Sequence, residues 1–275
     1  MADVLVDGIR FNVVRLGPPA DVPRAGPPVV FIHGLIIDNL SSFYYTLAPV
    51  VARRTDVICY DLRGHGRSER PVSGYRLEDA VGDLCGILDA TELHGPVQLV
   101  GNSFGGTVAL SVALWAPERV AAMALLEPHP AFDGWAGDMV EDLEDMVEGF
   151  DGPGMRDYIA ADAPRKMRSM VDCCDDLVAR SSLPDDFRSS RPMTAEDLGA
   201  VGCPSLLLYG DCSDILDRGF ALGDALAHSE LRLIEDCTHA LMMEAPETVT
   251  DLIVPWLADP AHQLPPRTLR SSARA

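Results

Sequence analysis

Short, continuous apolar runs separated by helix-length segments constrain the fold of this chain more than any other feature of its sequence. Each run is bounded by turn residues, as is typical of parallel strands buried on both faces of a sheet. The runs are VVFI (29–32), VICY (57–60), VQLV (97–100), AMALL (122–126), SLLLY (205–209) and LRLI (231–234). Helix-length segments lie at 41–53, 77–93, 105–116, 220–227 and 246–257. This alternation predicts right-handed βαβ units, and therefore an α/β fold with a doubly wound, mostly parallel sheet.

Three regions depart from this alternation. The first 14 residues alternate in polarity about an Asp-Gly turn, which predicts a β-hairpin. Residues 129–200 hold no buried-strand run and are acidic and helix-like, so we expect a small helical cap inserted after the sixth strand. The predicted core then comprises residues 1–128 and 201–258. Residues 259–275, rich in proline, serine and arginine, are predicted to form a flexible tail.

Composition excludes several classes of function. The net charge of −20 opposes binding to nucleic acid and to anionic membranes, because like charges repel. The seven cysteines are an odd number in a chain of this length, which argues against a disulfide framework and favours a reducing compartment. They also show no metal-ligand spacing. The longest apolar run, residues 120–126, is far shorter than the roughly 20 residues that cross a bilayer. We therefore expect a cytoplasmic protein that acts on a small molecule without a metal or cofactor.

A serine lies between glycines where a predicted strand meets a predicted helix, in GNSFGG (101–106). Gly-x-Ser-x-Gly at such a junction is a nucleophile elbow, in which a strained turn lifts the serine hydroxyl above the edge of the sheet. A free serine hydroxyl is a poor nucleophile, so it needs a general base and an acid that orients the base. Without those partners the motif would be only a structural turn. The sequence should therefore hold an Asp or Glu, and then a His, after later strands.

Both partners occur in that order. The stretch GDCSD (210–214) follows SLLLY, and EDCTH (235–239) follows LRLI, which makes His239 the candidate base. Asp211, Asp214 and Asp217 are candidate acids in or just after the first of these stretches. Glu127, at the end of the run AMALLE, is a further candidate acid.

With these stretches in chain order, the sequence resembles the α/β-hydrolase family from about residue 29 to residue 258. Two further stretches fit the family, FIHGL (31–35) and DLRGHGRS (61–68). The resemblance implies a structural turn at 61–68, without a catalytic role for His65, and a bracing role for His33. It implies roles for five residues: Ser103 as nucleophile, His239 as base, Asp214 as acid, and the backbone N–H groups of Leu35 and Phe104 as the oxyanion hole.

This machinery implies hydrolysis of an ester or thioester of a small to medium hydrophobic acyl compound through an acyl-enzyme. Serine rather than aspartate at the elbow argues against the dehalogenase and epoxide-hydrolase branches. Asn102, directly before the serine, is similar to the residue at that position in the branch that cleaves carbon–carbon bonds. That branch typically carries Trp directly after the base, where this chain has Ala240. Residues 33–51 resemble hydrolases of polyketide pathways, where the acyl group can be carrier-bound. Carbon–carbon hydrolysis, elimination and non-catalytic ligand binding are the alternatives.

Overall fold

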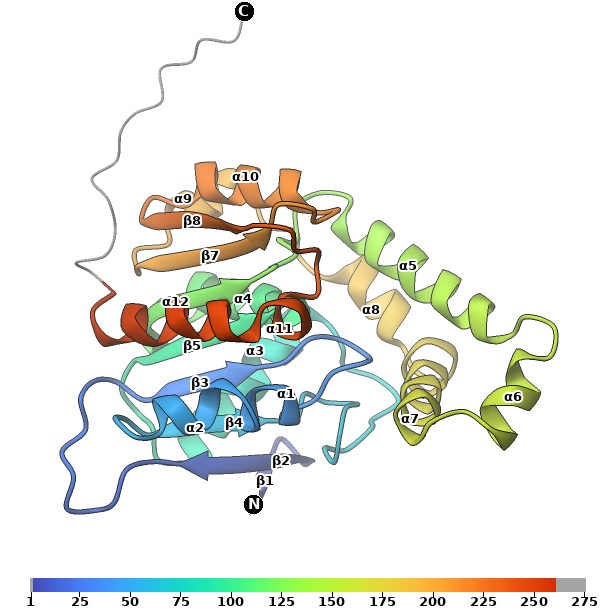
Figure 1. Ribbon diagram of the computed structural model, residues 1–275, viewed down its shortest axis with the longest axis horizontal. Coiled ribbons are helices and arrows are strands. Elements are labelled where there is room, and N and C mark those ends of the chain that lie inside the picture. The colour runs from blue at the N-terminus through green and yellow to red at the C-terminus, as the bar shows by residue number, and fades with distance from the viewer. Residues whose placement is uncertain (1, 261–275) are drawn as a thin grey trace, which may run out of the picture.

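The computed structural model describes residues 2–260, so most of the tail predicted at 259–275 lies outside the described residues. Its centre is an eight-stranded sheet with the order β1-β2-β4-β3-β5-β6-β7-β8 (Figure 1). The hairpin strands β1 (Ala2–Val6) and β2 (Ile9–Leu16) are antiparallel to each other, and β2 is antiparallel to β4. All other neighbours are parallel. The predicted doubly wound, mostly parallel sheet is therefore confirmed.

The six parallel strands fall on the six apolar runs of the sequence. They are β3 (Val29–Ile32), β4 (Val57–Tyr60), β5 (Val97–Asn102), β6 (Val120–Leu126), β7 (Ser205–Gly210) and β8 (Ser229–Ile234). The chain runs from β3 outward to β4 and then crosses back to β5 on the other side of β3. The carboxyl ends of β3 and β5 thus flank a topological switch point, which is where sheets of this type bind ligands.

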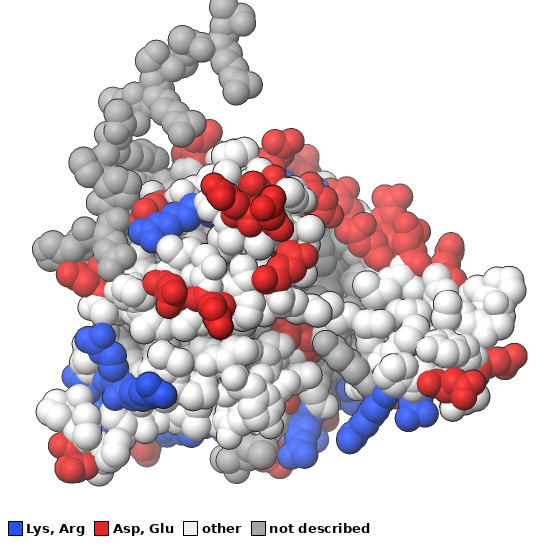
Figure 2. Space-filling view, viewed as in Figure 1, with Lys and Arg blue, Asp and Glu red and all other residues white. Residues whose placement is uncertain are grey.

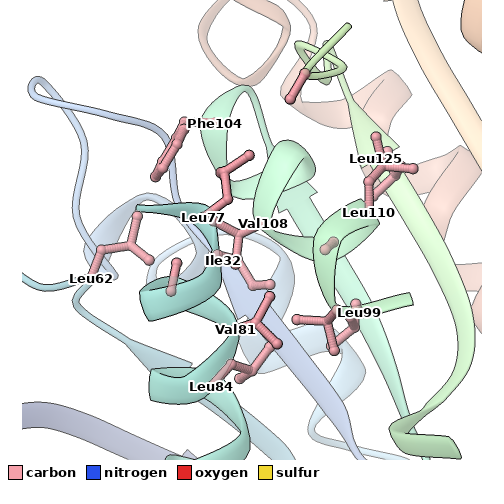
Figure 3. Close-up of a cluster of buried hydrophobic side chains, with 14 of the residues drawn as sticks. Ile32, Leu62, Leu77, Val81, Leu84, Leu99, Phe104, Val108, Leu110 and Leu125 are labelled. Carbon is pink, nitrogen blue, oxygen red and sulfur yellow. The ribbon is translucent and has the colours of Figure 1, made fainter. Parts of the chain in front are cut away.

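Alternate residues of the buried strands face two different cores, because side chains of a strand point to opposite faces of the sheet. In β3, Val30 and Ile32 join the cluster under α3 (Leu77–Ala90), α4 (Phe104–Trp115) and α10 (Leu216–Ala225). Figure 3 shows Leu77, Val81 and Leu84 of α3 beside Val108 of α4. Val29 and Phe31 join the cluster under α1 (Ser41–Tyr44), α2 (Leu47–Val51), α11 (Leu241–Glu244) and α12 (Pro246–Ala258). Helices therefore cover both faces.

Helix boundaries differ from the predicted ones in places. The helix expected at 41–53 is two short helices, α1 and α2, broken at Tyr45 and Thr46. Pro49 explains the break: inside one long helix it would lack an N–H for the Tyr45 carbonyl and would clash with it, whereas a first turn tolerates it. α3 ends at Ala90 rather than residue 93, and α10 begins at Leu216 rather than residue 220.

Helices fill the segment between β6 and β7, as predicted, and four of them project to the right in Figure 1. These four are α5 (Trp135–Phe150), α6 (Met155–Ala161), α7 (Arg165–Cys174) and α8 (Leu183–Ser189), with a π-helical turn at Asp175–Ala179 before α8. The short α9 (Ala195–Gly199) returns to lie beside α10. A 3-10 turn at Pro117–Arg119 precedes β6.

Acidic residues outnumber basic ones in this chain, and this imbalance is visible on its surface. On the face shown in Figure 2, acidic side chains gather over the upper part, including the region of α5, and basic side chains are fewer and lie mainly in the lower half. No helix within residues 2–260 is both long and apolar enough to span a membrane. In the same part of the chain, no group of three or more His, Cys, Asp or Glu side chains is arranged to hold a metal ion.

Candidate active site

Ser103 sits in a strained turn between β5 and α4, with φ 51° and ψ −119°. A non-glycine residue at positive φ typically costs about 1–3 kcal/mol and persists only where the surroundings enforce it. Two glycines make the turn possible. A Cβ at Gly101 would lie 2.4 Å from the Gly105 carbonyl oxygen, and one at Gly105 would lie 2.1 Å from the Ile32 carbonyl oxygen. The motif therefore forms the strained strand-to-helix elbow that its sequence predicts, with Ser103 half-buried.

His239 connects this serine to a buried carboxylate. Its Nε2 lies 3.0 Å from Ser103 Oγ, and its Nδ1 lies 3.1 Å from Glu127 Oε2. A carboxylate only accepts hydrogen bonds, so Nδ1 carries the proton and Nε2 is free to accept the serine proton. The expected pairing of Asp214 with His239 is corrected here, because no hydrogen bond joins them and Glu127, the alternative, is the partner.

Glu127 is fixed in place by the loop that was expected to supply the acid. The backbone N–H of Gly210 donates to its Oε1 at 2.6 Å, and the Ser213 hydroxyl donates to its Oε2 at 2.6 Å. With His239, three donors satisfy a carboxylate whose side chain is 0% exposed, as burial of a charge requires. Asp214, the next residue after Ser213, is exposed. Nothing in the sequence singled out Ser213, because its role depends on β6 and β7 being neighbours.

The two expected oxyanion donors lie beside one cavity. Leu35 and Phe104 both line a cavity of about 20 Å³. Phe104 is the first residue of α4, where backbone N–H groups have no partner inside the helix. No hydrogen-bond partner for the Leu35 N–H occurs within residues 2–260. Both groups are thus available to bind an oxygen that develops negative charge.

The two histidines near this loop act as braces. His33 Nε2 accepts a hydrogen bond from the Leu62 N–H at 2.9 Å, and His65 Nε2 accepts one from the Ile36 N–H at 2.8 Å. The turn at 61–68 therefore holds the loop that carries Leu35, which agrees with the structural role expected for it. Burial lowers the pKa of His65 from 6.5 to about 3, so its ring stays neutral and can accept this hydrogen bond.

His65 predicts acid sensitivity of the fold. Between pH 6.5 and about 3 the unfolded chain binds a proton at this position that the folded chain does not, so stability falls as pH falls. Within that window, each unit by which the pH falls should lower the free energy of unfolding by about 1.4 kcal/mol through His65. Urea unfolding at pH 7 and pH 5 measures this loss, which His65→Gln should reduce and His94→Gln, at an exposed position, should not. Equal pH dependence in wild type and His65→Gln would contradict the assignment.

Aromatic side chains of the projecting helices close over the elbow. The Phe104 ring stacks on Phe187 of α8 with centroids 5.3 Å apart, and Phe187 packs against Trp135 of α5 at 5.1 Å. Leu183 and Phe187 of α8 also line the cavity beside Leu35. The helices between β6 and β7 therefore form one wall of the candidate site.

Comparisons with known proteins agree with this fold. Residues 27–170 match the profile of the family described as alpha/beta hydrolase fold. The chain is 29% identical to 2-hydroxy-6-oxo-2,4-heptadienoate hydrolase of Pseudomonas putida strain F1, over 93% of this chain and 95% of that protein. The solved enol-lactonase from Burkholderia xenovorans LB400 has a TM-score of 0.71 at 20% identity, covering 94% of this chain and 100% of the other. An esterase from Exiguobacterium antarcticum has a TM-score of 0.68 at 22% identity, covering 93% and 98%.

Proposed function

The chain belongs to the α/β-hydrolase family, and from this premise we propose that it is a serine hydrolase of esters or thioesters with a small, uncharged acyl group. One observation carries the proposal: Ser103, His239 and Glu127 form a continuous hydrogen-bonded chain. Phe104, whose N–H has no partner inside its helix, directly follows Ser103. That arrangement suits a reaction through a tetrahedral intermediate.

The proposed reaction uses each of these groups in turn. His239 takes the Ser103 proton as the serine oxygen attacks the carbonyl carbon, and Glu127 stabilises the imidazolium that results. The N–H groups of Leu35 and Phe104 bind the oxyanion. The intermediate collapses to an acyl-serine when His239 protonates the leaving group. His239 then activates water, which releases the acid and restores the serine.

Charge at the cavity favours an uncharged acyl group. Its lining includes two arginines, and both are engaged: Arg63 forms an ion pair with Asp83, and Arg76 forms one with Asp79. An acyl carboxylate would therefore meet paired rather than free cations on this lining. The apolar remainder, which includes Leu62, Leu183 and Phe187, suits a short hydrocarbon acyl group, whether in a free ester or in a carrier-bound thioester.

The size of the cavity predicts a preference for short acyl chains. At about 20 Å³ it holds little more than one water molecule. Wild type should therefore hydrolyse p-nitrophenyl acetate with a kcat/KM about 10-fold or more above that for the hexanoate, because crowding costs 1–3 kcal/mol. Phe187→Ala should bring the acetate-to-hexanoate ratio of kcat/KM closer to 1, because it removes an aromatic ring from the cavity lining. Phe220→Ala, at an exposed phenylalanine of α10, should leave the ratio unchanged. An unchanged chain-length profile in Phe187→Ala would exclude this cavity as the acyl site.

The same ester series tests the proposed function. Hydrolysis that a serine-directed phosphonate blocks, with the label on Ser103, would support it. Inertness to both esters and phosphonate would instead favour a ligand-binding role on the same fold.

Carbon–carbon hydrolysis is a second candidate, because the relative from Pseudomonas putida is named for a dienoate substrate. That substrate class is a carboxylate, which the paired arginines of the cavity do not favour. Loss of the visible absorbance of a ring-cleavage dienoate, faster than hydrolysis of any ester, would establish this candidate over the first.

A further inference from the structure

The carboxylate of Asp38 gathers four donors in the loop between β3 and α1. Its Oδ2 accepts from the Gly34 N–H at 2.8 Å and from Asn102 Nδ2 at 3.3 Å. Its Oδ1 accepts from the Asn39 N–H at 2.9 Å and from the Ser42 hydroxyl. Hydrogen bonds to an ionised carboxylate are stronger than those between neutral groups. One side chain therefore joins the loop after β3, the start of α1 and the end of β5.

These contacts lie next to both oxyanion donors. Gly34 directly precedes Leu35, and Asn102 directly precedes Ser103. A Cβ at Gly34 would lie 3.3 Å from Asn102 Nδ2, 3.4 Å from Asp38 Oδ2 and 3.5 Å from Ser103 Cβ. The loop of Leu35 is thus pressed against the elbow, and Asp38 bonds to both sides of that contact.

We propose that Asp38 is a positioning residue, which fixes the separation of the Leu35 and Phe104 N–H groups by tying their two segments together. The proposal rests on the proposed hydrolase function. Oxyanion donors act only when they lie about 2.7–3.1 Å from the developing charge, so a small drift of one segment weakens stabilisation of the transition state.

The proposal also gives Asn102 a role that its likeness to carbon–carbon hydrolases left open. Its amide donates to Asp38 rather than standing free beside the nucleophile. The other chain neighbour of Leu35 is Ile36, at φ 59°, and its N–H donates to His65 Nε2. The Leu35 N–H therefore lies between two anchors, one on each neighbouring residue.

The test compares Asp38→Asn with wild type through kcat per active site titrated by phosphonate, and through inhibition by a trifluoromethyl ketone. Such a ketone forms an oxyanion adduct with the serine, whereas its unfluorinated analogue binds mainly as the ground state. Asp38→Asn should lower kcat per titrated site about 10- to 100-fold and weaken the trifluoromethyl ketone by a similar factor. KM and inhibition by the unfluorinated ketone should change less than about 3-fold.

Two further variants keep the test decisive. Asn102→Ala removes one of the four donors and should shift both readouts in the same direction by a smaller factor. Asp197→Asn alters a carboxylate that caps α9 through Thr194 and should change neither readout. If the Asp38→Asn variant keeps the kcat per titrated site of wild type, the proposal is overturned, even if fewer of its sites can be titrated. Asp38 would then have a purely structural role. Failure of wild type itself to label or to bind the fluoroketone would instead overturn the proposed function.

Discussion

Ser103→Ala is expected to lower ester turnover by about 10⁵-fold, because removal of the nucleophile disables the whole catalytic chain. The variant should also lose all labelling by phosphonate. The fold should persist, since alanine removes only the hydroxyl and leaves unchanged the two glycines, Gly101 and Gly105, that make the elbow possible. Steady-state kinetics with p-nitrophenyl acetate, together with thermal unfolding, measure both effects.

Ser111→Ala is the matched control for this change. Ser111 is a buried serine of α4, the helix that follows the elbow, and its hydroxyl donates to the Thr107 carbonyl rather than to a catalytic group. Its replacement should leave turnover within about 3-fold of wild type. Near-normal turnover in a folded Ser103→Ala protein would refute the assignment of the nucleophile.

Glu127→Gln is expected to cost about 10⁴-fold in kcat, because an amide does not hold His239 in the tautomer that accepts the serine proton. The amide also presents an N–H₂ group to a site that Gly210 and Ser213 fill with donors. Asp214→Asn is the matched control on the adjacent loop. It should change kcat less than about 3-fold, because Asp214 is exposed and Glu127, not Asp214, is hydrogen-bonded to His239.

The two variants decide between the acid that the structure shows and the acid that the sequence favoured. A crippled Asp214→Asn beside a mild Glu127→Gln would return the role to Asp214. The measurement is kcat at saturating ester, with circular dichroism to verify that both variants are folded.

Strong local patterns made the sheet and the elbow predictable from the sequence. The runs VVFI and VQLV are apolar at every or nearly every position, because both faces of β3 and β5 are buried, and the glycines around Ser103 mark a turn that tolerates no side chains. The prediction of a single helix at 41–53 was wrong, because it rested on the length of the segment and did not take account of Pro49.

The acid and its supports could not be chosen from sequence, since they depend on distances between strand ends. Glu127 and Asp214 follow adjacent strands, β6 and β7, and both precede His239 in the chain. Only the fold shows that the Glu127 carboxylate is hydrogen-bonded to His239 and that the Ser213 hydroxyl donates to the same carboxylate. Asp38 was equally hidden, because three of its four donors are near in sequence but Asn102 is 64 residues away.

Intact-mass spectrometry of His239→Ala after incubation with an ester or thioester tests the central claim most directly. Attack by Ser103 can proceed slowly without the base, whereas deacylation needs His239 to activate water, so an acyl-enzyme should accumulate. The account predicts a mass increase equal to the acyl group, located on Ser103 and absent from the double variant Ser103→Ala, His239→Ala. Consumption of the substrate without any adduct, together with substantial activity in Ser103→Ala, would contradict acyl transfer through Ser103.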